Sequence, residues 1–168
     1  MKGAVLALLS VLAVGQVVAL ERRTVERHTL APRITVGHDV SDLVMRDSDG
    51  AKIELGAPDE TLLLVFDPDC PYSVRVAESW AYWLASQGSE RPRTYAVSSG
   101  PLPAAVRYAR EMDWNVRVAS VGQAGREHPL TRRTPWVFAV GTDGRVVAEG
   151  HGSRLAEVAR SIGGGGRE

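Results

Sequence analysis

The sequence predicts an α/β domain in which a mixed β-sheet is flanked by helices. An unbroken apolar run, Thr61–Phe66, has the length of a strand that is buried on both faces. Apolar residues at helical spacing follow this run as far as Gly88, and a strand pattern followed by a helical one recurs between residues 93 and 112. Because this alternation ends in a hairpin and a last helix, we expect a mixed sheet with helices on both faces.

A short hairpin is predicted before the apolar run. Two apolar stretches, Leu43–Met45 and Ile53–Leu55, lie on either side of the turn-forming tetrapeptide Asp47–Gly50. The hairpin would therefore form an N-terminal extension of the domain.

The segment after the apolar run is predicted to be a helix. Pro71 suits a first helical turn, and Gly88 ends the pattern. The apolar positions that recur at helical spacing, and that we expect to face the core, are Val74, Ala77, Ala81, Leu84 and Ala85.

The following segments continue the alternation of strand and helix. Arg93–Ser98 is predicted to be a strand, Gly100 and Pro101 open a second helix, and Val116–Val121 is predicted to be a third strand. Residues 122–133 lack any periodicity and are predicted to be a loop.

A second hairpin and a last helix complete the predicted domain. Trp136–Val140 and Arg145–Ala148 flank the turn residues 142–144. Apolar residues from Leu155 to Ile162 recur at helical spacing and predict the last helix.

Residues 3–20 carry no charge and follow Met1 and Lys2, a basic start before an apolar run. Such a segment is either a cleaved export signal or a membrane anchor. In helical form it would span about 27 Å, near the lower limit for crossing a bilayer, so its length leaves both alternatives open. We expect an extracytoplasmic protein, periplasmic or on the outer face of the cytoplasmic membrane, that is membrane-anchored or secreted.

The rest of the chain divides around one domain. Residues 21–33 are polar, contain four Arg against two Glu and are predicted to be a linker after the signal or anchor segment at 1–20. One domain is expected at 34–163, and the glycine-rich end, 164–168, is predicted to be a flexible tail.

The charge balance and the cysteine content argue against nucleic-acid binding and exclude a disulfide within the chain. The chain has 20 Lys and Arg against 20 Asp and Glu, and this balance gives no electrostatic footprint for binding nucleic acid. It has a single cysteine, Cys70, so no disulfide can form within the chain even in an oxidising compartment. Cys70 is therefore a free thiol or pairs with another molecule.

The surroundings of Cys70 carry a family resemblance. The pentapeptide Asp69–Ser73 (Asp-Cys-Pro-Tyr-Ser) directly follows a predicted strand, and Thr134–Pro135 directly precedes another. Over residues 35–162 the combination resembles the thioredoxin superfamily. The lead-in hairpin is similar to that of its membrane-tethered, extracytoplasmic redoxin branch, which includes cytochrome c maturation proteins. The resemblance implies a thioredoxin-like fold with Cys70 at the active-site position.

The resemblance also implies roles for individual residues. In the family the proline that corresponds to Pro135 is cis and packs beside the active-site sulfur, where neighbouring backbone pairs with an incoming peptide. A cysteine at a helix start is favoured as thiolate by unpaired N–H groups and by the helix dipole. The implied catalytic positions are Cys70, Ser73 and Pro135, and the implied substrate-binding positions are Pro71, Tyr72, Thr134 and Trp136.

The chain departs from the family pattern in three ways. Ser73 stands where the usual motif has a second cysteine, and a hydroxyl cannot resolve a mixed disulfide. The buried acid expected on the preceding strand is missing, since Leu62–Leu64 occupy that region. Asp67 and Asp69 flank Cys70 and oppose its ionisation, so the sequence leaves the reactivity of the thiol open.

Side chains around the Thr-Pro corner also have two interpretations. Tyr72 and Trp136 either form an apolar rim around the sulfur or pack as ordinary aromatic residues. Arg132 and Arg133 either attract acidic partner segments and favour the thiolate, or belong to a solvated loop.

Three related activities fit less well. Monothiol glutaredoxins share Cys-Pro-Tyr-Ser, but the glutathione-binding Gly-Gly-x-Asp element is not found after the hairpin. A one-cysteine peroxiredoxin needs Thr or Ser at the position of Asp67. Copper delivery needs two thiolates and a histidine, whereas Cys70 has only the distant His128 and His151. We expect no metal and no cofactor.

Two main hypotheses remain. The first is a monothiol thiol–disulfide oxidoreductase whose Cys70 forms mixed disulfides with extracytoplasmic protein thiols and is released by an external thiol donor. The second is a redox-inactive binding or assembly module that keeps the fold, and copper handling is a weaker third. In each case the N-terminal segment would provide the contact with the membrane.

Overall fold

The computed structural model describes residues 33–162 apart from 57, 89–90 and 123–127. The chain divides into two compact units after Arg33, and the unit that begins at Ile34 contains every element below. No helix within the described ranges is long and apolar enough to cross a membrane. The apolar segment 3–20, the linker and the glycine-rich tail lie outside these ranges.

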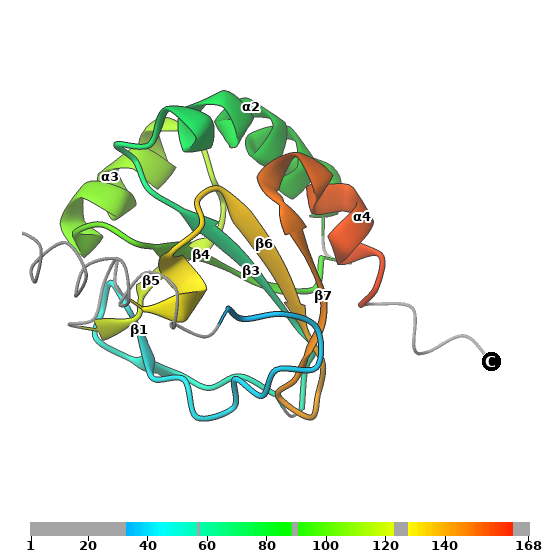
Figure 1. Ribbon diagram of the computed structural model, residues 1–168. Coiled ribbons are helices and arrows are strands. Elements are labelled where there is room, and N and C mark those ends of the chain that lie inside the picture. The colour runs from blue at the N-terminus through cyan, green and yellow to red at the C-terminus, as the bar shows by residue number, and fades with distance from the viewer. Residues whose placement is uncertain (1–32, 57, 89–90, 123–127, 163–168) are drawn as a thin grey trace, which may run out of the picture. The chain divides into compact units, whose positions relative to one another are not determined.

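A seven-stranded mixed sheet forms the centre of this unit, with strands in the order β2-β1-β5-β4-β3-β6-β7 (Figure 1). The strands are β1 (Met45–Asp47), β2 (Lys52–Ile53), β3 (Thr61–Phe66), β4 (Arg93–Ser98), β5 (Arg117–Ser120), β6 (Trp136–Val140) and β7 (Val146–His151). Strands β3, β4 and β5 are parallel neighbours, and the other pairs are antiparallel. The predicted mixed sheet is confirmed, and the predicted hairpin, β1–β2, joins it by pairing with β5.

Within the described residues, three α-helices flank the sheet, namely α2 (Pro71–Ser86), α3 (Leu102–Glu111) and α4 (Leu155–Ala159). All three contribute to one hydrophobic cluster with Leu62, Leu64 and Phe66 of β3. The prediction of helices on both faces is therefore wrong. The chain moves in the same direction from β3 to β4 to β5, and right-handed crossovers then place both connecting helices on the same side.

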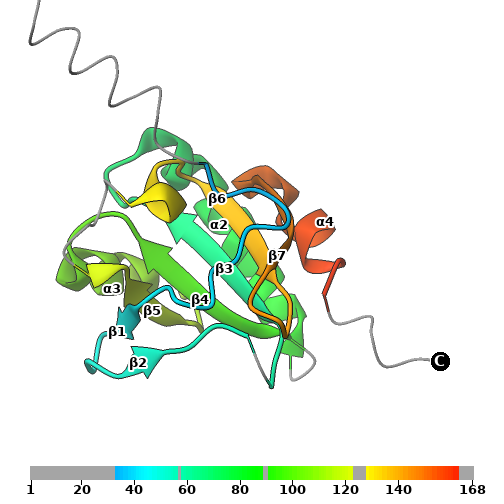
Figure 2. The ribbon, with the colours of Figure 1, turned by 60° about the horizontal axis from the view of Figure 1, so that its bottom comes forward.

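The opposite face of the sheet is covered by chain of a different kind. Leu63 and Val65 pack there with Ile34 and Val40 from the segment before β1, which crosses in front of the sheet in Figure 2. A 3-10 turn, η3 (Pro129–Thr131), adds the fully buried Leu130 to this face. The segment 122–133, which was predicted to be a loop, thus contains a short 3-10 turn. Because both faces of β3 are covered, all six of its residues are buried.

Helix α2 buries only two of the five positions that were predicted to face the core. It starts at Pro71 as expected, but Val76 and Trp80 face the core, whereas Val74 is 51% exposed and Ala85 is exposed. Trp80 decides the orientation because a tryptophan buries far more apolar area than valine or alanine. The last helix buries its predicted apolar residues, from Leu155 to Ile162.

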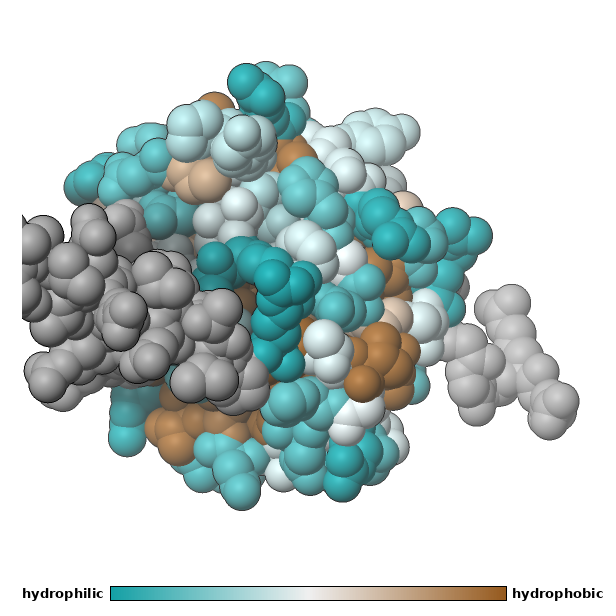
Figure 3. All heavy atoms as spheres, in the orientation of Figure 1, coloured by the Kyte–Doolittle hydropathy of each residue, from teal (hydrophilic) through white to brown (hydrophobic). Residues whose placement is uncertain are grey.

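The surface in the view of Figure 3 is largely hydrophilic, with hydrophobic side chains gathered in small patches. Few large apolar side chains of the described residues are exposed, and two of these, Tyr72 and Val74, lie in the first turn of α2. This end of α2 is where Cys70 is located.

Candidate functional site

Cys70 is held by backbone hydrogen bonds at the junction of β3 and α2. Its N–H donates to the carbonyl of Asp67 (3.0 Å), and its own carbonyl accepts the N–H of Val74 (3.1 Å), the first bond of the helix. Cys70 is the residue before the first helical position, with extended backbone angles, and Pro71 begins the helix. The thiol is thus half-buried at the positive end of a 16-residue helix.

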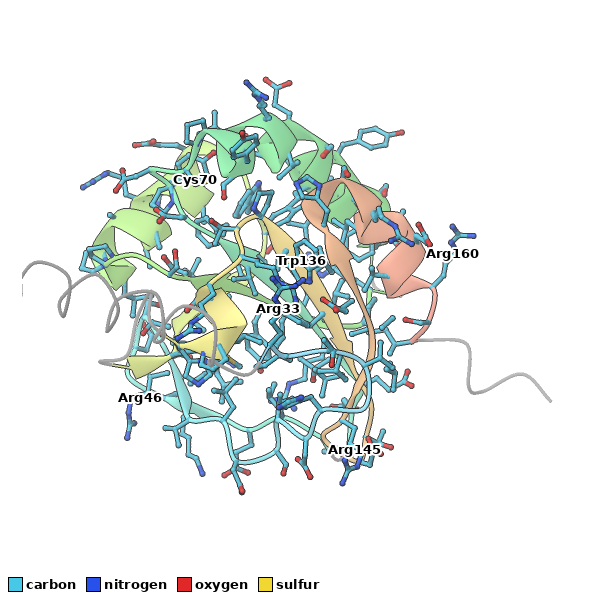
Figure 4. The ribbon with its side chains drawn as sticks, in the orientation of Figure 1. Arg33, Arg46, Cys70, Trp136, Arg145 and Arg160 are labelled. Carbon is cyan, nitrogen blue, oxygen red and sulfur yellow. The ribbon has the colours of Figure 1, made fainter. Side chains whose placement is uncertain are left out.

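The sulfur lies against the loop that precedes β6. The Cys70 thiol donates to the carbonyl oxygen of Thr134 over 3.6 Å, between residues 64 positions apart in the chain. The Thr134–Pro135 peptide bond is cis, as the family resemblance implied. The structure therefore brings the Cys-Pro and Thr-Pro segments together, with Cys70 at the start of α2 (Figure 4).

Hydrogen-bond donors favour the thiolate of Cys70. Burial is the largest influence and raises the pKa of the thiol. Four donors lower it, namely the backbone N–H groups of Ser73 and Tyr72 and the hydroxyls of Thr134 and Ser73. Together they outweigh burial, so the pKa of Cys70 lies below its ordinary value and the thiolate is more populated than in a free cysteine.

Ser73, where the family resemblance implies a resolving thiol, is almost fully buried, with 1% exposure. Its Oγ accepts the backbone N–H of Asp67 (3.1 Å), which leaves its own proton free for the sulfur of Cys70. Ser73 thus ties the loop before the helix to its first turn. It cannot attack a disulfide, so its contribution is to hold the loop and to stabilise the thiolate.

The two aspartates near the thiol have other partners. The Asp67 carboxylate is 8% exposed and accepts the N–H of Asp69 (3.0 Å), an Asx-type turn that shapes the approach to Cys70. Asp69 is exposed. The donors around the sulfur outweigh burial and set the direction of the pKa shift of Cys70.

Pro135 is buried between the sheet and the loop after β7. Its carbonyl accepts the N–H of Gly152 (3.1 Å), and the carbonyl of Gly152 accepts the indole N–H of Trp80 (2.8 Å). A Cβ on Gly152 would lie 2.8 Å from Cβ of Pro135 and 2.9 Å from Cζ2 of Trp80. A glycine is therefore required behind Pro135, a feature that the sequence pattern did not reveal.

A Gly152→Ala variant is expected to lose about 1–3 kcal/mol of unfolding free energy, the typical cost of overpacking a core. Urea denaturation of the full chain measures it. Gly100→Ala is the matched control, because a Cβ there would meet nothing closer than 3.7 Å, although Gly100 also lies next to the site. Equal stabilities for the two variants would show that the space behind Pro135 is not limiting.

The predicted rim residues have separate surroundings. Pro71 and Tyr72 are exposed on the first turn of α2, and the guanidinium of Arg75 lies 5.4 Å from the ring centroid of Tyr72. Trp136 is half-buried on β6, and Figure 4 shows it on a different element from Cys70. Tyr72 and Trp136 thus lie on different elements, and a joint aromatic rim around the sulfur stays a prediction.

Trp136 belongs to a cluster that the sequence did not suggest. Its indole N–H donates to the carboxylate of Glu149, which also pairs with Arg133 at 3.0 Å. The Arg133 guanidinium lies 3.9 Å from the Trp136 ring centroid. Because Glu149 neutralises Arg133, that arginine is not the free charge near Cys70 that the sequence allowed. Glu149 comes from β7, and only the strand pairing could have indicated it.

The histidines considered as metal ligands are engaged elsewhere. His128 Nδ1 accepts the N–H of Leu130 (3.2 Å), and His151 Nδ1 lies 2.9 Å from the hydroxyl of Ser153. Burial and, after it, the charge of Arg132 lower the pKa of His128. Among the described residues, no group of three or more His, Cys, Asp or Glu side chains could hold a metal ion.

Comparison with known proteins identifies the fold. No protein-family model matches the sequence, and no curated protein matches it. Among solved structures, a peroxiredoxin-like protein from Aquifex aeolicus is 18% identical with a TM-score of 0.60, covering 79% of this chain and 91% of its own. An uncharacterized thioredoxin-like protein from Porphyromonas gingivalis is 16% identical with a TM-score of 0.58, covering 75% of this chain and 92% of its own.

A third solved structure is similar over nearly its whole length. It is a secreted Mycobacterium tuberculosis disulfide oxidoreductase homologous to Escherichia coli DsbE, 13% identical with a TM-score of 0.54, and the match covers 71% of this chain and 95% of that one. At such identities the similarity establishes architecture and not activity. This chain therefore has the thioredoxin-like fold, with Cys70 and the cis Thr134–Pro135 bond facing each other at the helix start.

Proposed function

We propose that this protein carries out thiol–disulfide exchange through a single nucleophilic thiol, in which Cys70 attacks disulfides of partner proteins and forms mixed disulfides with them. The observation that carries the proposal is the sulfur at the start of α2, whose pKa is lowered by surrounding N–H and hydroxyl donors in spite of burial. A cysteine kept only for packing would have no need of those donors.

The reaction that this site supports is half of a thioredoxin cycle. The Cys70 thiolate attacks one sulfur of a partner disulfide, forms a new disulfide with it and releases the other sulfur as a thiolate. Ser73 cannot carry out the second attack, so an external thiol must supply the electrons that release the partner. We therefore place Cys70 as the nucleophile, and Ser73 and Thr134 as the groups that stabilise its thiolate.

We also propose an extracytoplasmic location, with the domain secreted or tethered by the apolar N-terminal segment. The support is the basic start followed by residues 3–20 without charge, together with the fold's similarity to a secreted disulfide oxidoreductase. An oxidising compartment would provide the disulfides on which Cys70 acts.

The test measures the reactivity of Cys70 in the full chain in detergent. Alkylation by iodoacetamide is expected to rise with pH through a pKa below that of free cysteine and to level off above it, because the thiolate alone reacts. On non-reducing gels, wild-type cells should show disulfide-linked species that an added thiol removes. Since the chain has one cysteine, Cys70→Ala should abolish every one of these species.

A thiol that ionises only well above neutral pH, with no disulfide-linked species in the wild type, would contradict the proposal. In that case, if Cys70→Ala also left the cellular phenotype intact while Tyr72→Ala impaired it, the domain would be a binding module that uses only the fold.

A further inference from the structure

The side chain of Arg133 joins three parts of the domain. Its terminal nitrogen Nη2 donates to the carbonyl of Ile34 (3.1 Å), the first residue of this unit, and to the carboxylate of Glu149 on β7 (3.0 Å). The guanidinium also lies over the ring of Trp136 at the start of β6. These three contacts form the Arg133 clamp, which ties the segment before β6 to residues 99 positions and 16 positions away in the chain.

The Arg133 clamp is partly shielded from water. The Glu149 side chain is only 17% exposed, the Arg133 side chain is half-buried, and Ile34 is buried. Hydrogen bonds between charged groups are stronger than those between neutral ones, and a carboxylate this buried is destabilised when its partner is removed. Arg133 is therefore held in one place, whereas the neighbouring Arg132 is exposed.

Thr134 follows Arg133 directly and contacts the thiol. Its carbonyl lies 3.6 Å from the sulfur of Cys70, and its hydroxyl is one of the donors that lower the pKa of Cys70. On the other side of Thr134, Pro135 is fixed by the N–H of Gly152 and by the lack of space behind it. Thr134 is thus flanked by two anchored residues, and Arg133 is the one that ties it to β7 and to the start of the unit.

We propose that Arg133 is a positioning residue whose clamp holds Thr134 against the sulfur of Cys70. This inference rests on the proposed exchange activity, because it concerns the thiol that carries out the exchange. Arg133 acts through its position and not through its charge, since Glu149 neutralises that charge. Loss of the clamp would let Thr134 move away from the sulfur and take a donor with it, so that less of Cys70 is ionised at neutral pH.

The test follows the alkylation of Cys70 by iodoacetamide as a function of pH, in the full chain in detergent. Arg133→Lys keeps the positive charge, but a lysine side chain is one bond shorter and cannot lie flat over the indole, so the clamp is lost. Its rate at neutral pH should fall about two- to fivefold, and the pH at which the rate levels off should rise. The alkaline plateau should be at least as high as in the wild type, because a thiolate of higher pKa is the stronger nucleophile.

Arg132→Ala is the matched control. It removes a positive charge from the adjacent position of the same loop, where the side chain is exposed, and its pH profile should match that of the wild type. If Arg133→Lys also matches the wild type, or if its rate changes by the same factor at every pH, the clamp does not position Thr134 and the inference is wrong. All variants leave in place the ionisable side chains on the other segment at the thiol, namely Asp67, Asp69, Tyr72 and Arg75.

Thr134→Val completes a double-mutant cycle. It removes the hydroxyl and keeps the shape of the side chain, so the pH at which the rate levels off should rise in this variant too. Because Arg133 acts through Thr134, adding Arg133→Lys to Thr134→Val should cause no further change in the profile. Additive changes would overturn the inference while leaving the exchange activity intact.

Two further outcomes are also decisive. If Arg133→Lys does not fold, Thr134→Val alone decides, since an unchanged pH profile would mean that the position of Thr134 has no effect on the thiol and would overturn the inference. A wild-type Cys70 that ionises like an ordinary cysteine would instead count against the proposed function, because the exchange depends on the thiolate.

Discussion

A Ser73→Cys variant is expected to release its disulfide-bound partner without added thiol, whereas the wild-type complex persists until an external thiol is supplied. Ser73 is buried in the first turn of α2, and its hydroxyl is within hydrogen-bond reach of the Cys70 sulfur. A thiol there could attack the mixed disulfide from within the molecule. The lifetime of the complex should fall by at least about a hundredfold, because an intramolecular group acts at a very high effective concentration.

The measurement is the decay of a purified mixed disulfide, followed on non-reducing gels after removal of free thiol. The Ser73→Cys substitution should lower the free energy of unfolding by only about 1 kcal/mol, since a sulfur accepts the N–H of Asp67 less well than the serine oxygen does. Ser73→Ala is the control. It lacks both hydroxyl and thiol, so its complex should persist as in the wild type while its Cys70 is alkylated more slowly at neutral pH. A Ser73→Cys complex as long-lived as the wild type would contradict the role assigned to this position.

Local patterns were sufficient to predict most elements of the domain. The run Thr61–Phe66 was predicted as a buried central strand because all six residues are apolar or small, and it is one. The cysteine at the helix start and its Thr-Pro partner were also predicted, although 64 residues separate them, because the family resemblance linked the two segments. These features could be predicted from the sequence because each of them is encoded in a short stretch of chain.

The wrong predictions concern features that depend on side-chain size or on the order of the strands in the sheet. The apolar positions predicted for the core face of α2 included Val74 and Ala85 and left out Trp80, but burial follows area, and the helix turns Trp80 inward. The helices were predicted on both faces because strand order is not visible in sequence, whereas the order β5-β4-β3 places α2 and α3 together.

The cluster around Trp136 was missed for a related reason. Glu149 is separated from it by 13 residues, and only the register of β6 and β7, which includes an irregularity between Ala139 and Val140, brings the two together. Gly152 was missed in the same way, since nothing in its neighbourhood in the sequence indicates that Pro135 and Trp80 crowd it. These contacts surround the site and shape it, so the position of Cys70 at the helix start was predictable while its setting was not.

Trp80→Ala is expected to be the most destabilising single change in the domain, with a loss of about 3–5 kcal/mol of unfolding free energy. Trp80 is fully buried, and its ring lies 5.5 Å from that of Trp114, which meets Phe66 edge-on. The loss is a large part of the stability of a typical small domain, about 5–15 kcal/mol in total. Urea denaturation measures it, and Tyr82→Ala on the same helix, with a side chain that is 79% exposed, should change stability by no more than about 0.5 kcal/mol.

The same variant should also disturb the thiol, because the indole N–H of Trp80 donates to Gly152, which in turn donates to the carbonyl of Pro135. Trp80→Phe separates the two effects, since it keeps most of the ring but removes the donor. It should retain most of the stability and still alter the alkylation rate of Cys70. An unchanged rate in a folded Trp80→Phe variant would mean that the hydrogen-bonded chain from α2 through Gly152 to Pro135 supports the fold alone and has no part in holding Thr134 against the sulfur.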